Sequence, residues 1–413
     1  MTKANKEGRR KAPILRFKGF TDDWEQRKLG EIGTTYSGLS GKNKSDFEKG
    51  NSNFVTFLEV LNNPILKNID LTNKVEIKEN EHQNKVKRND ILFNTSSETP
   101  EEVATSTVVD VNQDNLYLNS FCFGFRPNVQ FSNYYIGYYL RSNHFRSRVF
   151  CLAQGISRYN ISKKSLIKLK LSLPKLEEQD KISRIFNQIE LLLTLYERKL
   201  KLLSQVKKYF LDNLFAKKEY PNLRFKGYED TWLKSKFSKF LSIPEKVKVT
   251  IDSPSRILTV KLNLGGVQKG ANRTTLKLNS TTYYLRKAGQ LIYGKQNLFN
   301  GSLAIIPSQF EGYVTSGDVP SLNINNIDKR FLYYYIARKS FYKKTEAYSS
   351  GTGSKRIHEK TFLGFNIVYP EDLKEQEKIS KLISSINSNI ELYRSKKNNL
   401  MAIKKNLLNA MFI

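Results

Sequence analysis

Two long stretches of the chain carry apolar residues at alternating spacings of three and four, the first within 174–219 and the second within 371–413. This spacing predicts two long helices, each with a heptad seam of the kind that builds coiled coils. A partner tethered in the same chain is present at high local concentration, so the helices are expected to pair as an antiparallel coiled coil. A helix from Leu176 to Ala216 would be roughly 60 Å long at ~1.5 Å per residue, enough to hold two domains apart. The predicted seam consists of Ile182, Ile185, Ile189, Leu192, Tyr196, Leu203, Val206 and Phe210, and of Ile379, Leu382, Ile386, Tyr393, Leu400, Ile403 and Leu407.

Polar residues interrupt this seam. Lys199 and Lys396 fall at the same place in the two stretches, and Asn389 adds a further break. Interior polar residues of this kind can fix the register and orientation of a coiled coil. Leu200 and Ile390 stand next to the breaks, so a small shift of the seam explains the pattern equally well. An ordinary helix bundle or a homodimer zipper is the alternative to pairing within one chain.

Short apolar runs bounded by Gly, Asn and Pro fill the segments between these helices, and such runs predict strands. A helix follows the strands in each half, over 132–150 and over 328–345, and its tyrosines recur at helical spacing, as core residues do. The fold class predicted is α+β, with two pseudo-symmetric α/β domains separated by the two long helices. Each domain is expected to hold a twisted, mainly antiparallel sheet or partial barrel. The strand runs are NFVTFLEV, DILFNTS, TSTVVDV and LYLNSFCFGF in the first half, and RILTVKL, GQLIYGK, SLAIIP and GYVTS in the second.

The two halves also repeat each other in order. The segment Leu15-Arg16-Phe17-Lys18-Gly19 returns at 223–227, and the only two tryptophans, Trp24 and Trp232, follow at matching places. The segment at 178–183, EQDKIS, returns at 375–380 as EQEKIS. A repeat of about 200 residues is far longer than a solenoid unit and indicates duplicated domains related by pseudo-symmetry.

Charge narrows the choice of partner. The 413 residues carry 69 Lys and Arg against 39 Asp and Glu, a formal charge of +30, which favours a phosphate polymer as ligand. A Lys-rich surface that only aids solubility is the alternative. A membrane partner is disfavoured, since no stretch approaches the ~20 consecutive apolar residues of a span. Residues 1–12 are basic but precede no apolar segment, so they are expected to form a flexible arm of a cytoplasmic protein.

Motifs for chemistry are missing. The stretch at 36–43, YSGLSGKN, lacks the first Gly and the last hydroxyl of a phosphate-binding loop. The segment at 63–66, NPIL, departs from the Asn-Pro-Pro-aromatic motif of amino-methyltransferases at its third and fourth positions. Cys122 and Cys151 are expected to be buried core thiols. Neither the three histidines nor the carboxylates at 98, 101 and 102 are assigned a catalytic or metal-binding role. The histidines, which are expected on the surface, are His82, His144 and His358.

Taken together, the repeated anchors resemble the specificity subunit of type I restriction-modification systems. The resemblance is carried by the segment at 15–20 with Trp24, by LPKLEEQDKI at 173–182 where it enters the long helix, and by the second copy of both. It covers nearly the whole chain. The chain departs from a strict repeat at 369–376, which is one residue longer than its counterpart, and this changes how the second domain meets its helix.

The resemblance implies a division of labour. Residues 13–173 and 220–370 would be two target-recognition domains, each reading one half of a split double-stranded DNA site. The spacer helices at 174–219 and 371–413 would set the gap and dock two methyltransferase (modification) subunits. S-adenosylmethionine would be bound by those subunits, and ATP and Mg²⁺ by separate restriction and translocation subunits. This chain itself would be a non-catalytic subunit without a cofactor.

Sequence recognition needs hydrogen-bonding side chains on loops that reach a DNA groove. Polar loops that follow the predicted strands at matching places in the two halves are the candidates, with an ordinary solvent-exposed loop as the alternative for each. Two other functions remain open: an enzyme acting alone, such as a nuclease, and a coiled-coil scaffold that binds RNA. The candidate DNA contacts are Asn94, Thr95, Ser96, Ser97, Arg158, Tyr159 and Asn160 in the first domain, and Lys295, Gln296, Asn297, Lys355 and Arg356 in the second.

Overall fold

The structure is a computed structural model, which describes residues 12–47, 49–251, 253–270, 281–351 and 354–413. The predicted flexible arm at 1–12 lies almost wholly outside the described residues. The chain forms two compact units. Unit 1 is Met1–Glu197 together with Ser395–Ile413, and unit 2 is Arg198–Arg394. Each unit therefore combines one α/β domain with parts of both long helices.

A five-stranded sheet in the order β2-β10-β6-β8-β4 forms the centre of unit 1, and its neighbours are antiparallel except for the β4–β8 pair. All residues of β6 and β8 are buried, as expected for continuous apolar runs covered on both faces. A smaller sheet has the order β5-β3-β9, and β1 pairs with β12 just before the long helix begins. The strands are β1 (Glu25–Lys28), β2 (Gly33–Ser37), β3 (Ser52–Val55), β4 (Ile65–Leu66), β5 (Lys74–Val75), β6 (Ile91–Asn94), β7 (Ser96–Ser97), β8 (Ser106–Val109), β9 (Leu116–Leu118), β10 (Cys122–Pro127), β11 (Tyr159–Asn160) and β12 (Lys170–Leu173).

Two local predictions for the first domain are wrong. The run NFVTFLEV is a strand only in its first half, because Thr56 accepts from the amide of Glu59 and starts helix α1 (Phe57–Asn62). The single helix predicted over 132–150 is two helices, α2 (Asn133–Tyr139) and α3 (Asn143–Phe150). The hydroxyl of Ser142 accepts from the amide of Phe145 at 3.3 Å and so begins the second one. A short α4 (Lys163–Leu166) precedes β12.

Unit 2 repeats this plan with different detail. A four-stranded sheet has the order β14-β22-β19-β20, a three-stranded sheet the order β15-β18-β21, and β13 pairs with β23 as β1 pairs with β12. The strands are β13 (Leu233–Lys236), β14 (Leu241–Ser242), β15 (Lys248–Val249), β16 (Leu258–Val260), β17 (Val267–Lys269), β18 (Tyr283–Leu285), β19 (Leu291–Tyr293), β20 (Leu303–Ile305), β21 (Val314–Ser316), β22 (Ser321–Ile324) and β23 (Asn366–Tyr369).

Helices pack their aromatic faces on these sheets. In unit 2 the segment predicted as one helix over 328–345 is divided into α6 (Lys329–Ile336), α7 (Lys339–Tyr342) and a 3₁₀ helix (Lys343–Tyr348), and α8 (Glu359–Leu363) precedes β23. The tyrosines of α2 and α6 lie in the cores, as predicted. The buried ones are Tyr135, Tyr138 and Tyr139 in unit 1, and Tyr334 and Tyr335 in unit 2.

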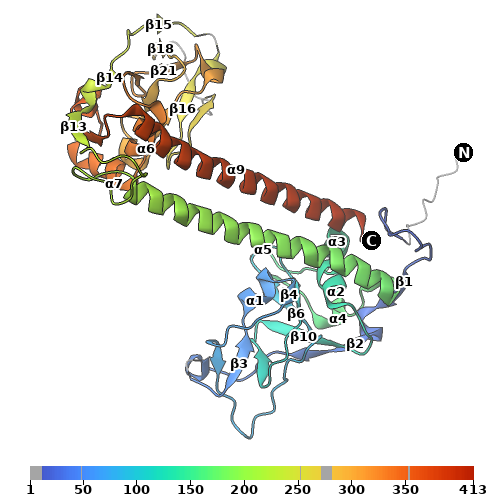
Figure 1. Cartoon of the computed structure of the whole chain (residues 1–413). Helices are drawn as coiled ribbons and strands as arrows, with labels where there is room; N and C mark the ends of the chain where they lie inside the picture. Colours follow the sequence, from blue (N-terminus) through green and yellow to red (C-terminus); the bar gives the residue numbers. More distant parts are fainter. Residues whose placement is uncertain (1–11, 48, 252, 271–280, 352–353) are drawn as a thin grey trace, which may run out of the picture. The chain divides into compact units, whose positions relative to one another are not determined.

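The two long helices are α5 (Leu176–Asn213) and α9 (Leu373–Ala410), each of 38 residues (Figure 1). They run antiparallel within each unit. In unit 1, Lys404 forms an ion pair with Glu190, and Lys397 pairs with Glu197 at 2.8 Å. In unit 2, the Lys199 ammonium lies 5.8 Å from the centre of the Tyr393 ring. The α+β class and the antiparallel long helices are therefore confirmed.

The seam itself is shifted from the predicted one. Leu192 and Val206 are each 42% exposed and Ile403 is 51% exposed, so these three predictions are wrong. The alternative interpretation holds, because Leu200 is half-buried and Ile390 is buried. The seam shifts because Phe186, rather than Ile185, is buried in the aromatic core of unit 1, where it stacks on Tyr138. On α5 the inward positions are Ile182, Phe186, Ile189, Leu193, Tyr196, Leu200, Leu203, Lys207 and Phe210.

The lysines predicted to interrupt the seam, Lys199 and Lys396, are exposed. The polar residues at inward positions are instead Lys207 on α5 and Lys397 and Lys404 on α9, all three only partly exposed. In the described part of the chain, no helix combines the length and the apolar character needed to cross a membrane.

Candidate nucleic-acid interface

Each domain is fixed to the start of its long helix by a buried polar cluster. In unit 1, Arg16 donates two hydrogen bonds to the Glu178 carboxylate, both at 2.8 Å, and the indole of Trp24 donates to the same group at 3.2 Å. In unit 2, Arg224 donates to Glu375 at 2.8 and 2.9 Å, and Trp232 donates at 3.3 Å. We call each set the anchor cluster.

These clusters explain the repeated motifs. The hydrogen bonds that Arg16 donates to the Glu178 carboxylate raise the pKa of Arg16, and those that Arg224 donates to Glu375 raise the pKa of Arg224. The neighbouring glutamine also repeats its role, since Gln179 accepts from the amide of Ser132 and donates to the carbonyl of Pro174. Gln376 makes the equivalent bonds at 328 and 370. The most recognisable residues of the sequence thus hold the domains in place and are not themselves a binding site.

The far end of each helix enters the core of the other domain. Met411 and Phe412, at the end of α9, pack in the aromatic core of unit 1. Leu214 and Phe215, just after α5, occupy the matching place in unit 2. The cores are built from segments far apart in the sequence, so each unit needs both helices.

The loops predicted to contact DNA in the first domain lie together. Strand β7 pairs with β11, joining the segment after β6 to a hairpin loop at 154–160. The guanidinium of Arg158 donates to the hydroxyl of Ser96 at 3.2 Å. Arg158 and Asn160 are exposed, and Thr95 and Tyr159 are half-buried. These four side chains stand at the surface of the loop pair.

Three of the predicted contacts are buried and face the protein. Asn94 is the last residue of the buried strand β6, and its side chain donates to the carbonyl of Glu102 at 3.0 Å. Ser97 donates to the carboxylate of Glu102 at 2.7 Å, and Ser96 is 7% exposed. These three side chains support the loop from inside, so Asn94 and Ser97 are not available to contact bases.

The second domain brings its predicted loops together in the same way. The amide of Ile357 donates to the carbonyl of Lys295 at 2.9 Å, as the amide of Ile161 donates to that of Thr95 at 3.0 Å. The backbones of Ser350 and Arg356 pair as those of Gln154 and Asn160 do. Lys355 is exposed, and the side chains of Lys295, Gln296, Asn297 and Arg356 are partly exposed.

A polar cleft of about 510 Å³ lies next to these loops in unit 2. Its lining includes Lys246, Tyr284, Arg286, Lys295, Asp318 and Glu359. Lys295 pairs with Glu359 at 3.0 Å, and Arg356 pairs with Asp318 at 3.5 Å. Two of the predicted basic side chains are therefore paired with carboxylates.

Burial and charge act against each other in this cleft. Burial lowers the pKa of Arg286 to about 10, which still leaves the guanidinium charged at neutral pH. Burial acts to raise the pKa of Glu359, but hydrogen bonds from its own backbone amide and from Lys295, with the charge of Lys246, outweigh it and the pKa is lowered. The cleft thus presents fixed charges of both signs.

Chemical groups suited to catalysis are not assembled in the described residues. There, no three of the His, Cys, Asp and Glu side chains come close enough to hold a metal ion. His82, His144 and His358 are all exposed. Cys122 is buried as predicted, but Cys151 is exposed at the end of α3, so its assignment to the core is wrong.

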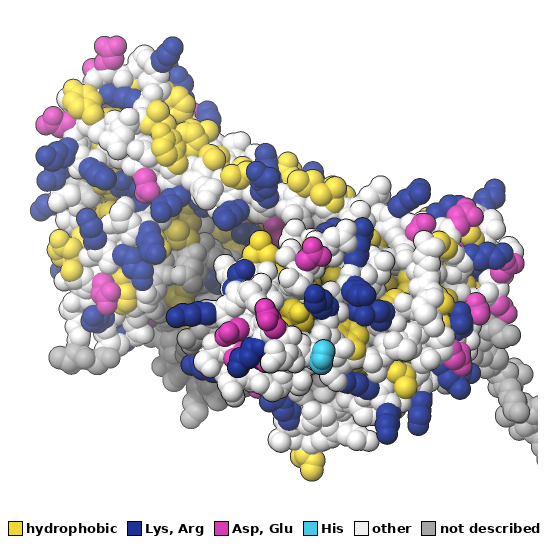
Figure 2. All heavy atoms as spheres, turned by 90° about the horizontal axis from the view of Figure 1, so that it is seen from below, with side chains coloured by type: hydrophobic (Ala, Val, Ile, Leu, Met, Phe, Trp, Pro, Cys, Tyr) yellow, Lys and Arg dark blue, Asp and Glu magenta, His cyan; other side chains and the backbone are white. Residues whose placement is uncertain are grey.

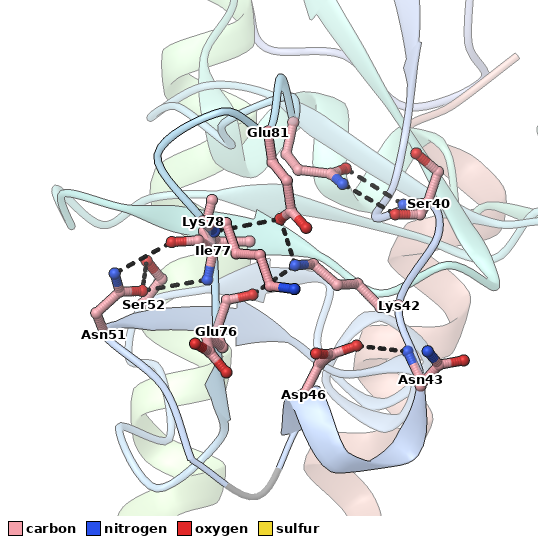
Figure 3. A network of polar contacts seen from close by, with 11 residues as sticks. Ser40, Lys42, Asn43, Asp46, Asn51, Ser52, Glu76, Ile77, Lys78 and Glu81 are labelled. Carbon is pink, nitrogen blue, oxygen red and sulfur yellow. Dashed lines mark hydrogen bonds and ion pairs between the residues drawn. The ribbon is translucent and has the colours of Figure 1, made fainter.

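The stretch that resembles a phosphate-binding loop has a structural role. The ammonium of Lys42 is bound to the carboxylate of Glu81 and, at 2.6 Å, to the carbonyl of Glu76 (Figure 3). Ser40 is joined to Gln83 through its backbone amide and carbonyl. These contacts fasten the segment at 38–43 to the one at 76–83, and the lysine is already occupied.

Basic side chains spread over the molecular surface outside these clusters. Figure 2 shows Lys and Arg distributed across one face, with fewer carboxylates between them. The loop residues were predicted from the sequence, but the cleft residues Lys246, Tyr284 and Arg286 were not, because they come together with Lys295 and Glu359 only in the folded chain. The fold thus defines a protein of two units built on one plan, each with a pair of polar loops and a buried anchor cluster.

Comparison with known proteins identifies the family. The family model for the type I restriction modification DNA specificity domain matches residues 21–205 and 265–402, more than half of the chain. The chain therefore belongs to this family, and it is a DNA specificity subunit of a type I restriction-modification system.

Relatives and solved structures agree with this assignment. The chain is 23% identical to the type I restriction enzyme MjaVIII specificity subunit of Methanocaldococcus jannaschii, covering 62% of this chain and 64% of that protein. It is also 23% identical to the putative MjaX specificity subunit of the same organism, over 94% and 93% of the two chains. A crystal structure of the S subunit from M. genitalium has the same fold, with a TM-score of 0.60, 13% identity and coverage of 97% and 99%. A structure described for complex assembly and conformational transition of the type I R-M system gives a TM-score of 0.53, 14% identity and coverage of 94% and 97%.

Proposed function

We propose that the chain recognises a bipartite DNA target, with one half-site bound by the loops of each unit. The observation that carries this proposal is that the two units have the same anchor cluster but different side chains on their loops. The anchor clusters of the two units are matched residue for residue, whereas the loops differ, with Arg158 and Asn160 exposed in unit 1, and Lys355 exposed and Arg356 partly exposed in unit 2. Two units with the same anchor cluster and different loop side chains are suited to binding two half-sites of different sequence.

The proposed base contacts are the side chains that the loops expose. In unit 1 these are Thr95, Arg158, Tyr159 and Asn160, and in unit 2 Lys295, Gln296, Asn297, Lys355 and Arg356. Arg and Lys suit the acceptors of guanine, and Asn and Gln suit adenine. Ser96 is retained as the group that positions Arg158.

Substitution of one arginine in each unit tests this assignment. The chain is assembled with its methyltransferase subunits, and methylated adenines are mapped on genomic DNA. Arg158→Ala is expected to relax one half-site only, and Arg356→Ala the other, with about 1–3 kcal/mol of discrimination lost at the contacted base pair. Arg184→Ala, which removes an exposed charge on α5, is the matched control and should leave the target unchanged. Equal weakening on all sequences would show that the arginine contacts phosphate.

The long helices are proposed to dock the methyltransferase subunits. Apolar side chains stand exposed along α5, where Leu191 is 60%, Leu195 49%, Leu202 48% and Tyr209 57% exposed. Exposed apolar side chains repeated along one helix are typical of an interface. Leu195→Asp should reduce co-purification of the methyltransferase without changing the thermal stability of the chain. Arg198→Glu, at an exposed position nearby on α5, tests the effect of added negative charge alone.

In this assembly the chain needs no cofactor of its own. S-adenosylmethionine would belong to the two methyltransferase subunits, and ATP and Mg²⁺ to the restriction and translocation subunits. Reproducible DNA cleavage by the purified chain with Mg²⁺ alone would overturn this division and favour an enzyme that acts by itself.

A further inference from the structure

The hairpin loop at 154–160 in unit 1 carries an apolar residue at its tip. Ile156 is 97% exposed, the largest exposed fraction among the large apolar side chains of the described residues. It stands two residues before Arg158, on the loop that pairs with β7. An isoleucine in full contact with water contributes nothing to the core, and this one stands on the loop that also carries the exposed Arg158 and Asn160.

The loop holds this side chain in a fixed position. The amides of Gln154 and Asn160 donate to each other's carbonyls, at 2.9 and 2.8 Å. Gly155 has a φ of 131°, and a Cβ at this position would lie 2.1 Å from the carbonyl oxygen of Arg158. The Arg158 side chain is tied to Ser96 across the strand pair. The tip is therefore a short closed loop that only glycine allows.

An aliphatic side chain cannot form hydrogen bonds with base edges. Next to base-contacting groups it has two uses: contact with a thymine methyl, or insertion between neighbouring base pairs, as apolar wedges of bending proteins do. Insertion needs a rigid support and a side chain that projects clear of the protein surface. Ile156 meets both conditions, since it is almost fully exposed and stands on a closed loop.

We propose that Ile156 inserts into the base stack of the half-site bound by unit 1 and unstacks one base step there. The matching position in the second half is Thr352, which lies outside the described residues and has a smaller, polar side chain. The two half-sites are therefore bound differently, and the distortion is confined to the first. This inference rests on the proposed assignment of the first half-site to unit 1.

Fluorescence of 2-aminopurine tests the insertion. Duplexes that contain the mapped target carry the probe at one position at a time, and the complex of the full chain with its methyltransferase subunits is added. The methylated adenine is left out of the scan, since its extrusion by the methyltransferase would brighten it. We expect a several-fold increase at one step of the first half-site and none in the second.

Variants identify the side chain responsible. Ile156→Ala should abolish the fluorescence increase and weaken DNA binding about tenfold. Ile156→Leu should retain both the fluorescence increase and the wild-type affinity. Leu58→Ala, which removes an exposed apolar side chain on α1, is the control and should change neither. The salt dependence of binding should be the same for all variants, because no phosphate contact is removed.

Three results would overturn the proposal. The first is the absence of brightening with the wild-type chain, and the second is brightening that persists in Ile156→Ala. The third is a loss of binding, when uracil replaces thymine in the first half-site, as large as the loss caused by Ile156→Ala. This result would show that Ile156 contacts a thymine methyl group. None of these would affect the half-site assignment, which fails separately if Arg158→Ala leaves the first half-site unchanged.

Discussion

The backbone amide of Leu15 donates to the carbonyl of Ala410 at 2.9 Å, which joins the described start of the chain to the end of α9 in unit 1. In unit 2 the amide of Leu223 donates to the carbonyl of Asn213, the last residue of α5, also at 2.9 Å. The two contacts are equivalent under the internal repeat. Each domain therefore begins beside the end of a long helix, and only in unit 2 is that helix the preceding segment of the chain.

A fragment ending at Lys218 should consequently dimerise. In the full chain, Met411 and Phe412 fill the core of unit 1, and Leu214 and Phe215 of a second fragment can take their place. The internal repeat has an offset of 197 residues, so Lys207 corresponds to Lys404. In the dimer Lys207 can therefore form the ion pair with Glu190 of the other copy. Light scattering should show a dimer that binds a symmetric DNA site. A folded, strictly monomeric fragment would contradict the pairing described here.

The complementary fragment from residue 219 should dimerise less well. Asn387 and Arg394 occupy the positions that correspond to Glu190 and Glu197, so a pair of α9 helices would lack both ion pairs and would set Arg394 against Lys397. The dimer of the first fragment would keep the Glu190 pair with Lys207 in both symmetric copies. Losing these two partly exposed pairs costs about 1–2 kcal/mol, or roughly tenfold in the dimer dissociation constant. Sedimentation of both fragments at the same concentrations provides the comparison, and Arg394→Glu should restore part of the difference.

Removal of an anchor carboxylate should destabilise its unit strongly. Glu178→Ala leaves the guanidinium of Arg16 and the indole of Trp24 without their shared partner, a change that costs about 3–5 kcal/mol for a buried ion pair. Glu375→Ala should have the same effect in unit 2. Urea denaturation measures both, and Glu177→Ala, which removes an exposed carboxylate, should cost less than about 1 kcal/mol. Equal effects of Glu177→Ala and Glu178→Ala would show that the cluster contributes little.

The duplication and the long helices were predictable because both are periodic. Repeated anchors such as Trp24 and Trp232 stand out in one sequence, and three-four spacing reports a helix without tertiary information. The anchor pairing was not predicted, since Arg16 and Glu178 are 162 residues apart and nothing local links them. Their repetition at matching places was the available signal.

The shifted seam shows where periodicity stops being sufficient. Ile185 and Phe186 fit the two possible seams about equally in sequence, and the choice between them depends on what each helix meets. Phe186 stacks on Tyr138 of α2, at 4.8 Å between ring centres, and so points into unit 1. The same holds for Asn94, the predicted DNA contact at the end of β6, because a residue at a strand end is buried or exposed according to the loop that covers it.

Lys207 should lower the stability of the chain at neutral pH. Burial lowers its pKa, although the charge of Glu391 opposes this. Below the lowered pKa the folded chain must hold a charged, partly buried lysine, so the cost is fully present there and disappears as the pH rises through the ordinary value near 10.5. Lys207→Leu should therefore stabilise the chain by about 1 kcal/mol at pH 7, and by less at pH 10.

Urea denaturation of this variant at the two pH values is the measurement, with Lys208→Leu as the exposed control. A gain that is equal at both pH values would assign the effect to apolar packing alone. A loss of stability at pH 7 would mean that the charge of Glu391 outweighs burial.

The two thiols should react differently. Burial raises the pKa of Cys122 to about 12, so this thiol stays protonated and enclosed, whereas Cys151 is exposed. A disulfide reagent should modify one equivalent in the native chain between pH 7 and 9, and two in guanidinium chloride. Cys151→Ser should remove the native reaction, and a remaining fast equivalent would show that the sheet around Cys122 opens.

The matched anchor clusters also affect how such a chain can evolve. The anchor contacts that join a domain to its helix are made by residues at the edges of the domain, at 16, 24 and 178 or at 224, 232 and 375. The loops between those edges can be exchanged by recombination as a cassette without rebuilding the helical frame. A single crossover could then give a cell a new restriction target while the distance between its two halves stays the same.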